Sequence, residues 1–226
     1  MNYRRVLVFG AHPDDEIAMA GAIAKFAMKK AKVTILTFTD GCEGYPMPEM
    51  KETIVTVRRK ESNASDRVLG VHSHIHLEIP DMALVNNKET ILRCVHAIRK
   101  VRPDAIFTHG PDEHHRDHIA AHEISIEASW QAGEPVVAEL GPPWETPHLY
   151  FYAGVQGMRP RVTCDVSETE HKRLLARARH LSQHILWGRS KEDFEQEAKW
   201  IKRSKRKFVE QFYLADDFLL RDFPPR

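Results

Sequence analysis

Apolar residues follow two different spacings along the first 130 positions, and each spacing predicts one kind of element. Short apolar runs rich in β-branched residues and bounded by turn residues predict buried strands. Longer segments with apolar residues at helical spacing predict helices. The predicted strands cover residues 6–10, 32–39, 73–79 and 104–109, and the predicted helices cover 17–29, 53–69, 88–101 and 117–131. Four successive strand–helix pairs predict an α/β fold with a Rossmann-like, mostly parallel β-sheet flanked by helices.

The pattern changes after Gly133. Four prolines within residues 133–148 predict an irregular connection. Two short β-rich runs follow at 149–153 and 161–166, and apolar spacing then predicts helices over 168–187 and 192–213. The chain is therefore expected to form one domain over residues 1–226. Its βα core covers 1–132, and 133–226 supplies the connection, short strands and a helical C-terminal extension.

Composition narrows the class of protein. The formal net charge of +1 gives no overall attraction to nucleic acid or to an anionic membrane. No apolar run approaches the length of a membrane span, and no signal peptide is visible. Three cysteines far apart in the sequence argue against a disulfide framework and favour the cytoplasm. Five of the 14 histidines fall within residues 109–122, which makes that segment a candidate for chemistry.

The first chemical motif is Ala11-His12-Pro13-Asp14-Asp15-Glu16, directly after the first predicted strand. In open α/β sheets, ligands bind in the crevice outside the carboxyl ends of the strands. Proline and acidic residues at this position also cap a helix and complement its dipole. Capping does not account for His12. From these residues alone, a metal site and a capped helix start are equally supported.

The second motif, His114-His115-Arg116-Asp117-His118, follows the fourth predicted strand. The carboxyl ends of parallel strands meet at one edge of a sheet, so the two motifs are expected to converge there. Neutral imidazoles and carboxylates are ligands of Zn²⁺, and catalytic zinc has three protein ligands and an open position. A cluster of surface histidines that binds metal adventitiously is the alternative.

Together, His12-Pro13-Asp14-Asp15-Glu16 and His115-Arg116-Asp117-His118 resemble the motifs of the PIG-L/LmbE family of zinc-dependent N-deacetylases. Those enzymes remove the acetyl group from N-acetylglucosamine-type substrates. Further segments are similar to family motifs in the same order, namely Thr39-Asp40-Gly41, Arg58-Arg59-Lys60-Glu61, Pro80-Asp81, His180-Leu181-Ser182-Gln183 and Val209-Glu210-Gln211-Phe212. The resemblance therefore covers nearly the whole chain.

The resemblance implies a role for each motif residue. The implied metal ligands are His12, Asp15 and His118, and the implied general base is Asp14. A carboxylate beside the metal takes a proton from water and passes it to the leaving amine. His115 is expected to be the cation that stabilises the oxyanion beside the metal, and Asp117 to orient His115 and support its charge.

The resemblance also implies that Arg58 and Asp81 contact the substrate. An ion pair of Arg58 with Glu61 and a strand end at Asp81 are equally simple explanations for these two residues. The chain departs from the family pattern at Arg116, where a proline is usual. It also has Glu113-His114 where family members often have a tyrosine. Without that tyrosine, oxyanion stabilisation is left to His115 and the metal.

The expected function is metal-dependent hydrolysis of an N-acetylglucosamine-type amino sugar or its conjugate, with release of acetate. The expected cofactor is Zn²⁺, although the ligand types also suit other divalent ions such as Fe²⁺. The expected partner is a small N-acetylated amino sugar or conjugate, with no nucleic acid and no membrane span. The resemblance further implies a homo-oligomer, a trimer or a hexamer.

Alternative functions are an amidase acting on a sugar–thiol conjugate, a phosphoesterase, and a non-catalytic protein that binds a sugar or a nucleotide. Asp14 argues against a mere binding protein, which has no use for a base beside the water. A Gly-x-Gly-x-x-Gly motif is missing after the first predicted strand, which argues against a dinucleotide site.

Overall fold

The strands form one mixed sheet. The computed structural model describes residues 3–157, 159–160 and 162–215, within which seven strands lie in the order β3-β2-β1-β4-β5-β7-β6. Five of them run parallel: β1 (Arg5–Gly10), β2 (Lys32–Thr39), β3 (Ser73–Ile79), β4 (Ala105–His109) and β5 (Leu149–Ala153). Strand β7 (Val209–Leu214) pairs antiparallel with β5 and with β6 (Val162–Asp165). The predicted mostly parallel, Rossmann-like sheet is confirmed.

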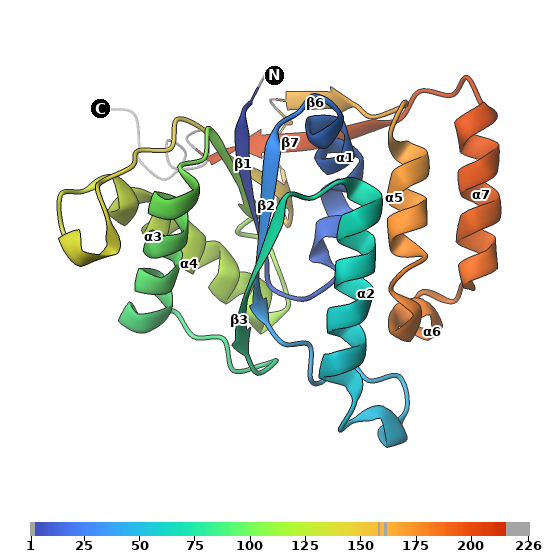
Figure 1. Ribbon diagram of the computed structural model, residues 1–226, viewed down its shortest axis with the longest axis horizontal. Coiled ribbons are helices and arrows are strands. Elements are labelled where there is room, and N and C mark those ends of the chain that lie inside the picture. Colours follow the sequence, from blue (N-terminus) through green and yellow to red (C-terminus); the bar gives the residue numbers. More distant parts are fainter. Residues whose placement is uncertain (1–2, 158, 161, 216–226) are drawn as a thin grey trace.

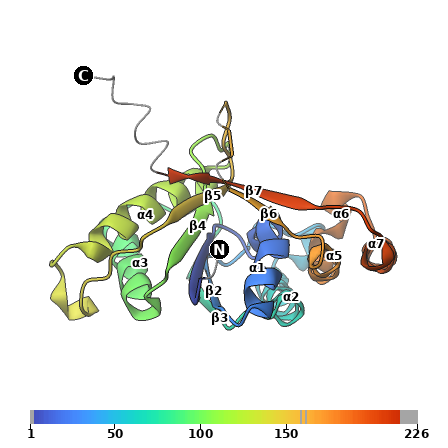
Figure 2. The same ribbon diagram turned by 90° about the horizontal axis from the view of Figure 1, so that it is seen from above.

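Helices cover both faces of this sheet (Figures 1 and 2). On one face lie α1 (Ala20–Met28), α2 (Ile54–Leu69) and α5 (Glu170–Arg177), and on the other lie α3 (Lys88–Val101) and α4 (Arg116–Gly133). The strands are apolar on both faces, as buried parallel strands must be. In β1, Val6 and Val8 enter the core under α1, whereas Leu7 and Phe9 enter the core under α3 and α4.

Two helices follow α5. Helix α6 (His184–Trp187) continues a 3₁₀ turn, and α7 (Lys191–Arg203) packs on the outer side of α5 through Phe194, Ala198 and Ile201. These helices confirm the predicted helical C-terminal extension. No helix in the described part of the chain combines the length and the apolar character that crossing a membrane requires.

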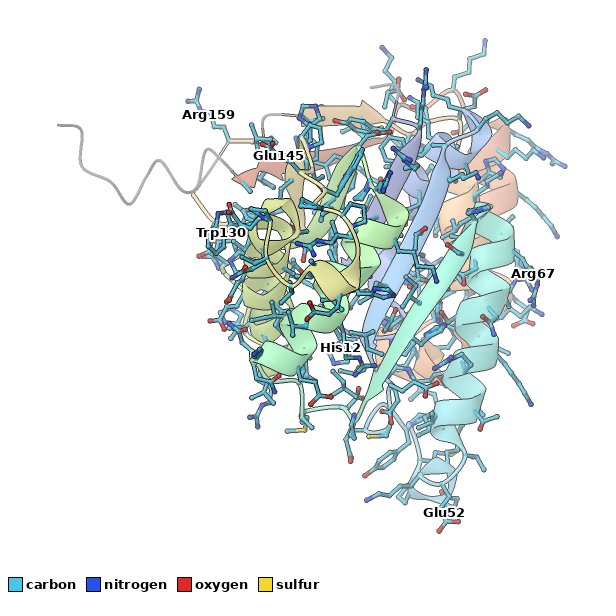
Figure 3. All side chains as sticks on the ribbon, turned by 60° about the vertical axis from the view of Figure 1, so that its left-hand side comes forward. His12, Glu52, Arg67, Trp130, Glu145 and Arg159 are labelled. Atoms are coloured by element: carbon cyan, nitrogen blue, oxygen red, sulfur yellow. The ribbon has the colours of Figure 1, made fainter. Side chains whose placement is uncertain are left out.

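The position of β1 in the sheet determines where a ligand can bind. The chain runs from β1 outward to β2 and β3, and then returns to β4 on the other side of β1. The loops after β1 and β4 therefore leave in different directions, which opens a crevice at the carboxyl ends of these two strands. Figure 3 shows His12 at that end of the strands, on the side of the molecule where the loop that carries Glu52 projects.

The C-terminal third differs from its prediction. The helix expected over 168–187 is divided into α5, a 3₁₀ turn and α6. The helix expected over 192–213 ends at Arg203, and residues 209–214 form β7, so the prediction of helix over 204–213 is wrong. Phe212 packs edge-on against Phe107 at 5.1 Å in the core under α1. Pairing with β5 and β6 and this burial outweigh the local helical spacing. The first α-helix is also shorter than predicted, because Asp15–Met19 forms a 3₁₀ turn before it.

Glu210 of β7 forms hydrogen bonds with the first turn of α1. Its carboxylate accepts hydrogen bonds from the backbone nitrogens of Gly21 and Ala22 at 2.9 and 2.8 Å. Burial nevertheless raises the pKa of Glu210 to about 7, because it outweighs the two N–H donors and the charge of Arg173. The folded protein therefore holds this proton at pH values where the unfolded chain has released it.

This raised pKa predicts a dependence of stability on pH. Its contribution to the free energy of unfolding is present below the ordinary glutamate pKa of 4.5 and is lost as the pH rises through about 7. Between pH 4.5 and pH 8, the wild type should lose about 1–3 kcal/mol more stability than Glu210→Gln, whose side chain does not titrate. Urea unfolding across this range measures the difference. Parallel curves for the two proteins would contradict the assignment.

Candidate active site

The loop after β1 is held by hydrogen bonds from β2 and by hydrogen bonds within the loop. Thr39 at the end of β2 donates from Oγ1 and from its backbone nitrogen to the carbonyl of Ala11, at 2.8 and 2.9 Å. Asp15 Oδ2 accepts from the His12 backbone nitrogen at 2.7 Å. Asp14 stands at the N-cap of the 3₁₀ turn, but its side chain makes no capping hydrogen bond. Helix capping therefore does not explain Asp14.

The three expected metal ligands come together. His12 Nδ1 lies 3.1 Å from His118 Nε2, His118 Nε2 lies 3.5 Å from Asp15 Oδ1, and His12 Nδ1 lies 3.8 Å from Asp15 Oδ2. Bonds of about 2.0–2.2 Å in a tetrahedral zinc site place neighbouring donor atoms roughly 3.3–3.6 Å apart. The separations of 3.1–3.8 Å lie close to that range, with each oxygen of Asp15 facing one imidazole. Two imidazoles and one carboxylate are ligand types that suit a divalent transition-metal ion.

His109, the last residue of β4, belongs to the same cluster but was not among the predicted site residues. Asp15, His109 and His118 offer donor atoms within 4.8 Å of one another. His109 is only 2% exposed, and its Nε2 lies 3.1 Å from Asp15 Oδ2. Burial lowers the pKa of His109, but the charges of Asp15 and Glu113 outweigh burial and raise it to about 9. The contact between His109 Nε2 and Asp15 Oδ2 holds the Asp15 carboxylate in place.

Glu113 is the second residue that the sequence did not predict. Its Oε2 lies 3.2 Å from His118 Nδ1, and its Oε1 lies 3.4 Å from His109 Nδ1. Hydrogen bonds from these two imidazoles lower the pKa of Glu113 to about 2. Gly154, with φ of +65°, makes room for this carboxylate, since a Cβ there would lie 2.6 Å from it. The signal in the sequence was an acidic residue five positions before His118, at the place where the family often has tyrosine.

Asp117 faces a different histidine from the one expected. Its Oδ2 lies 3.3 Å from His12 Nε2 and accepts from the Met82 backbone nitrogen at 2.7 Å. His115 instead accepts, through Nδ1, from the backbone nitrogen of Asp117 at 3.2 Å. The prediction that the Asp117 carboxylate orients His115 is corrected, because the first turn of α4 directs that carboxylate under His12. Asp117 thus holds the imidazole of a candidate metal ligand from the side opposite the other donors.

His115 is the exposed member of the cluster. Its ring stands edge-on to that of His12, with centroids 4.6 Å apart. Burial and the neighbouring His12 and His118 lower the pKa of His115, which favours the neutral ring. Because Nδ1 accepts a hydrogen bond, the proton of the neutral ring lies on Nε2.

Arg58 contacts Asp14 rather than Glu61. Its Nη2 donates to Asp14 Oδ1 at 2.7 Å, and its Nη1 donates to the Gly41 carbonyl at 3.3 Å. The side chain is 4% exposed. Gly41 has φ of +78°, and a Cβ there would lie 2.8 Å from the guanidinium. Glu61 is occupied elsewhere, since it accepts from the backbone and hydroxyl of Ser182.

Asp81 anchors the loop after β2. It accepts from the backbone nitrogens of Gly41 and Glu43, both at 3.1 Å, and lies 3.8 Å from Arg58 Nη1. Neither Arg58 nor Asp81 lines the adjoining cavity. The contacts of Arg58 and Asp81 therefore make them supports of Asp14 and of the turn at Gly41.

A cavity of about 540 Å³ opens beside this cluster. Asp14, Asp15 and His118 line it. Residues of α5, α6 and β7 line it as well, including Arg177, Trp187 and Glu210. Its volume lies within the range of about 300–1,000 Å³ in which proteins bind small molecules.

Known proteins are similar to this chain in sequence and in fold. The PIG-L family, described as GlcNAc-PI de-N-acetylase, matches residues 7–129. The 1D-myo-inositol 2-acetamido-2-deoxy-alpha-D-glucopyranoside deacetylase of Streptomyces avermitilis is 32% identical over 178 residues, which cover 66% of this chain and 60% of that protein. The chain thus spans about three fifths of the length of that relative.

Two solved structures have the same fold. The N,N'-diacetylchitobiose deacetylase from Pyrococcus horikoshii superposes with a TM-score of 0.82 at 23% identity, over 99% of this chain and 88% of that one. GalB, the 4-carboxy-2-hydroxymuconate hydratase from Pseudomonas putida, superposes with a TM-score of 0.77 at 22% identity, over 98% of both chains. One fold therefore carries two reactions, so the reaction must be argued from the site itself.

Proposed function

The chain belongs to the PIG-L family, and we propose that it is a metal-dependent N-deacetylase acting on an N-acetylglucosamine-type amino sugar or its conjugate. One observation carries this proposal. Asp14 lines the same cavity as Asp15 and His118, yet its carboxylate is bound by Arg58 and is not one of the clustered donors. A carboxylate beside a metal site, free to exchange a proton, is what amide hydrolysis requires.

The proposed metal ligands are His12, Asp15 and His118. A Zn²⁺ ion bound there supplies Lewis acidity and lowers the pKa of water to about 7. Arg58 holds Oδ1 of Asp14, and we assign Oδ2 as the atom that takes the proton from water and returns it to the leaving amine. Nε2–H of His115 is the proposed donor to the oxyanion, since Nδ1 already accepts from the backbone.

Three further residues position these groups. Asp117 orients His12, Glu113 orients His118, and Arg58 orients Asp14. Arg58 and Asp81 were expected to contact the substrate, but their contacts support a positioning part in the loop. Zinc as the native metal, homo-oligomeric assembly and a cytoplasmic location stay predictions.

Acetate release tests the proposed function. Purified protein without a histidine tag is incubated with a panel of N-acetylated amino sugars and glycosides, with and without a chelator. Chelator-sensitive acetate release from at least one substrate is the expected result. Turnover only of sugar–thiol conjugate amides or phosphoesters would identify a different hydrolase. Saturable sugar binding without any turnover would identify a binding protein.

Glu113→Gln is expected to weaken metal binding by about 10- to 100-fold, because a neutral amide supports the imidazole of His118 less well than a carboxylate. Competition with a chromophoric chelator measures the dissociation constant directly, independently of turnover. Glu123→Gln is the matched control, since Glu123 is an exposed glutamate of the same helix as His118. Equal metal affinity in the wild type and Glu113→Gln would exclude the positioning role.

A further inference from the structure

Arg177 lines the cavity beside the clustered histidines. It is the last residue of α5, and its guanidinium carbon lies 4.4 Å from the centre of the Trp187 ring and 5.2 Å from that of Phe194. Trp187 lines the same cavity, as do Asp14, Asp15 and His118. Stacking on the indole holds the planar guanidinium in one orientation while leaving its N–H groups available.

Arg177 differs from the arginines around it in having no anionic partner. Arg173 donates from Nε to both carboxylate oxygens of Glu170, at 3.0 and 2.9 Å. Arg189 pairs with Glu197 at 2.6 Å. Among the residues that the structure describes, no carboxylate forms an ion pair with Arg177, whereas its neighbours all have one. A guanidinium that lines a cavity without an ion-pair partner is a candidate to bind an anionic ligand.

The carboxylates of the cavity wall have other donors. Glu170 is held by Arg173, and Glu210 is held by the backbone nitrogens of Gly21 and Ala22. The charge of Asp14 acts on Arg177, but Asp14 is hydrogen-bonded to Arg58. A guanidinium presents paired N–H groups that match the two oxygens of a carboxylate or a phosphate. Arg177 and Trp187 thus offer a negative group a cation next to an aromatic face.

We propose that Arg177 and Trp187 form a subsite for an anionic substituent, a carboxylate or a phosphate, on the part of the substrate away from its acetamido group. The inference rests on the proposed deacetylase function, because it assumes that the acetamido group lies beside Asp14, Asp15 and His118. It narrows the substrate class to N-acetylated amino sugars whose aglycone carries a negative charge.

The test compares three N-acetylglucosaminides with hydroxyethyl, carboxymethyl and phosphoethyl aglycones. The wild type should have a higher kcat/KM for at least one anionic glycoside than for the neutral one. Arg177→Met should lower this ratio of anionic to neutral kcat/KM by about 10- to 100-fold. If the ratio falls more for the carboxymethyl glycoside, the recognised group is a carboxylate, and if it falls more for the phosphoethyl glycoside, it is a phosphate. Arg179→Met is the matched control, because Arg179 lies two residues further, pairs with Glu195 and does not line the cavity.

The ratio of anionic to neutral kcat/KM separates recognition of the anion from a general structural effect. If Arg177→Met lowers kcat/KM equally for all three glycosides, or leaves this ratio unchanged, the proposal is overturned. If none of the glycosides is deacetylated, the proposed function fails, and calorimetry with the corresponding glucosaminides then tests the subsite alone. Tighter binding of an anionic glucosaminide that is lost in Arg177→Met supports the subsite. Equal binding by both proteins overturns it.

Discussion

Replacing Asp14 by asparagine is expected to lower kcat for acetate release by roughly 10²- to 10⁴-fold, the usual contribution of a general acid–base group. The amide keeps the shape of the carboxylate and can still accept from Arg58, so the loop after β1 should remain folded. An amide does not take a proton from water, so the reaction loses its base while the clustered donors stay intact. Stopped assays of acetate release measure the change in kcat.

Metal content distinguishes this role from that of the neighbouring aspartate. Asp14→Asn should retain the metal of the wild type, whereas Asp15→Asn should lose metal and activity together, because Asp15 is a member of the donor cluster. Elemental analysis of both variants gives the metal bound per chain. Full activity of Asp14→Asn with metal bound would show that another group is the base.

Removal of the metal is expected to have the other large effect. Dialysis against a chelator should lower the rate of acetate release by roughly 10³-fold or more, corresponding to several kcal/mol of activation free energy. Returning about one equivalent of Zn²⁺ or Fe²⁺ per chain should restore it, and the ion that restores the higher rate is the better candidate for the native metal.

A second measurement on the same samples tests where the ion binds. An ion that binds only the folded chain raises its apparent stability, so the midpoint of thermal unfolding should fall when the metal is removed. In His118→Ala the midpoint should respond to added metal much less than in the wild type. A chain that deacetylates at its full rate with no detectable metal would refute the metal-dependent mechanism.

The sequence predicted the βα core closely because the signals there are local. Strands β2 and β3 and helix α3 have the predicted bounds, and Gly70 ends α2 in the left-handed conformation (φ of +79°) that glycine adopts readily. Strand β7 was missed for the opposite reason. Its strand partners are β5 and β6, and its core contact is Phe107, so nothing within the segment itself distinguishes it from a helix.

In the site, too, the features with local signals were predictable and those set by long-range packing were not. The convergence of His12, Asp15 and His118 was predictable because each lies in a short motif at the end of a predicted strand, and the sheet brings those ends together. Which side chain faces which was not predictable. Asp117 turned out to face His12, and Glu113 to face His118, because side-chain direction depends on how α4 begins and on the space beside Gly154.

Because β7 comes late in the chain, the donor residues of the cluster are synthesised before part of the cavity wall. Every donor of the metal cluster precedes α5, whereas Phe208, Val209 and Glu210 form part of the cavity wall. Contacts between residues far apart in sequence form slowly, and a growing chain cannot make them before both partners have been synthesised. The nascent chain therefore contains all the proposed metal ligands before it contains the whole wall of the cavity, so the proposed metal site can be complete before the cavity is.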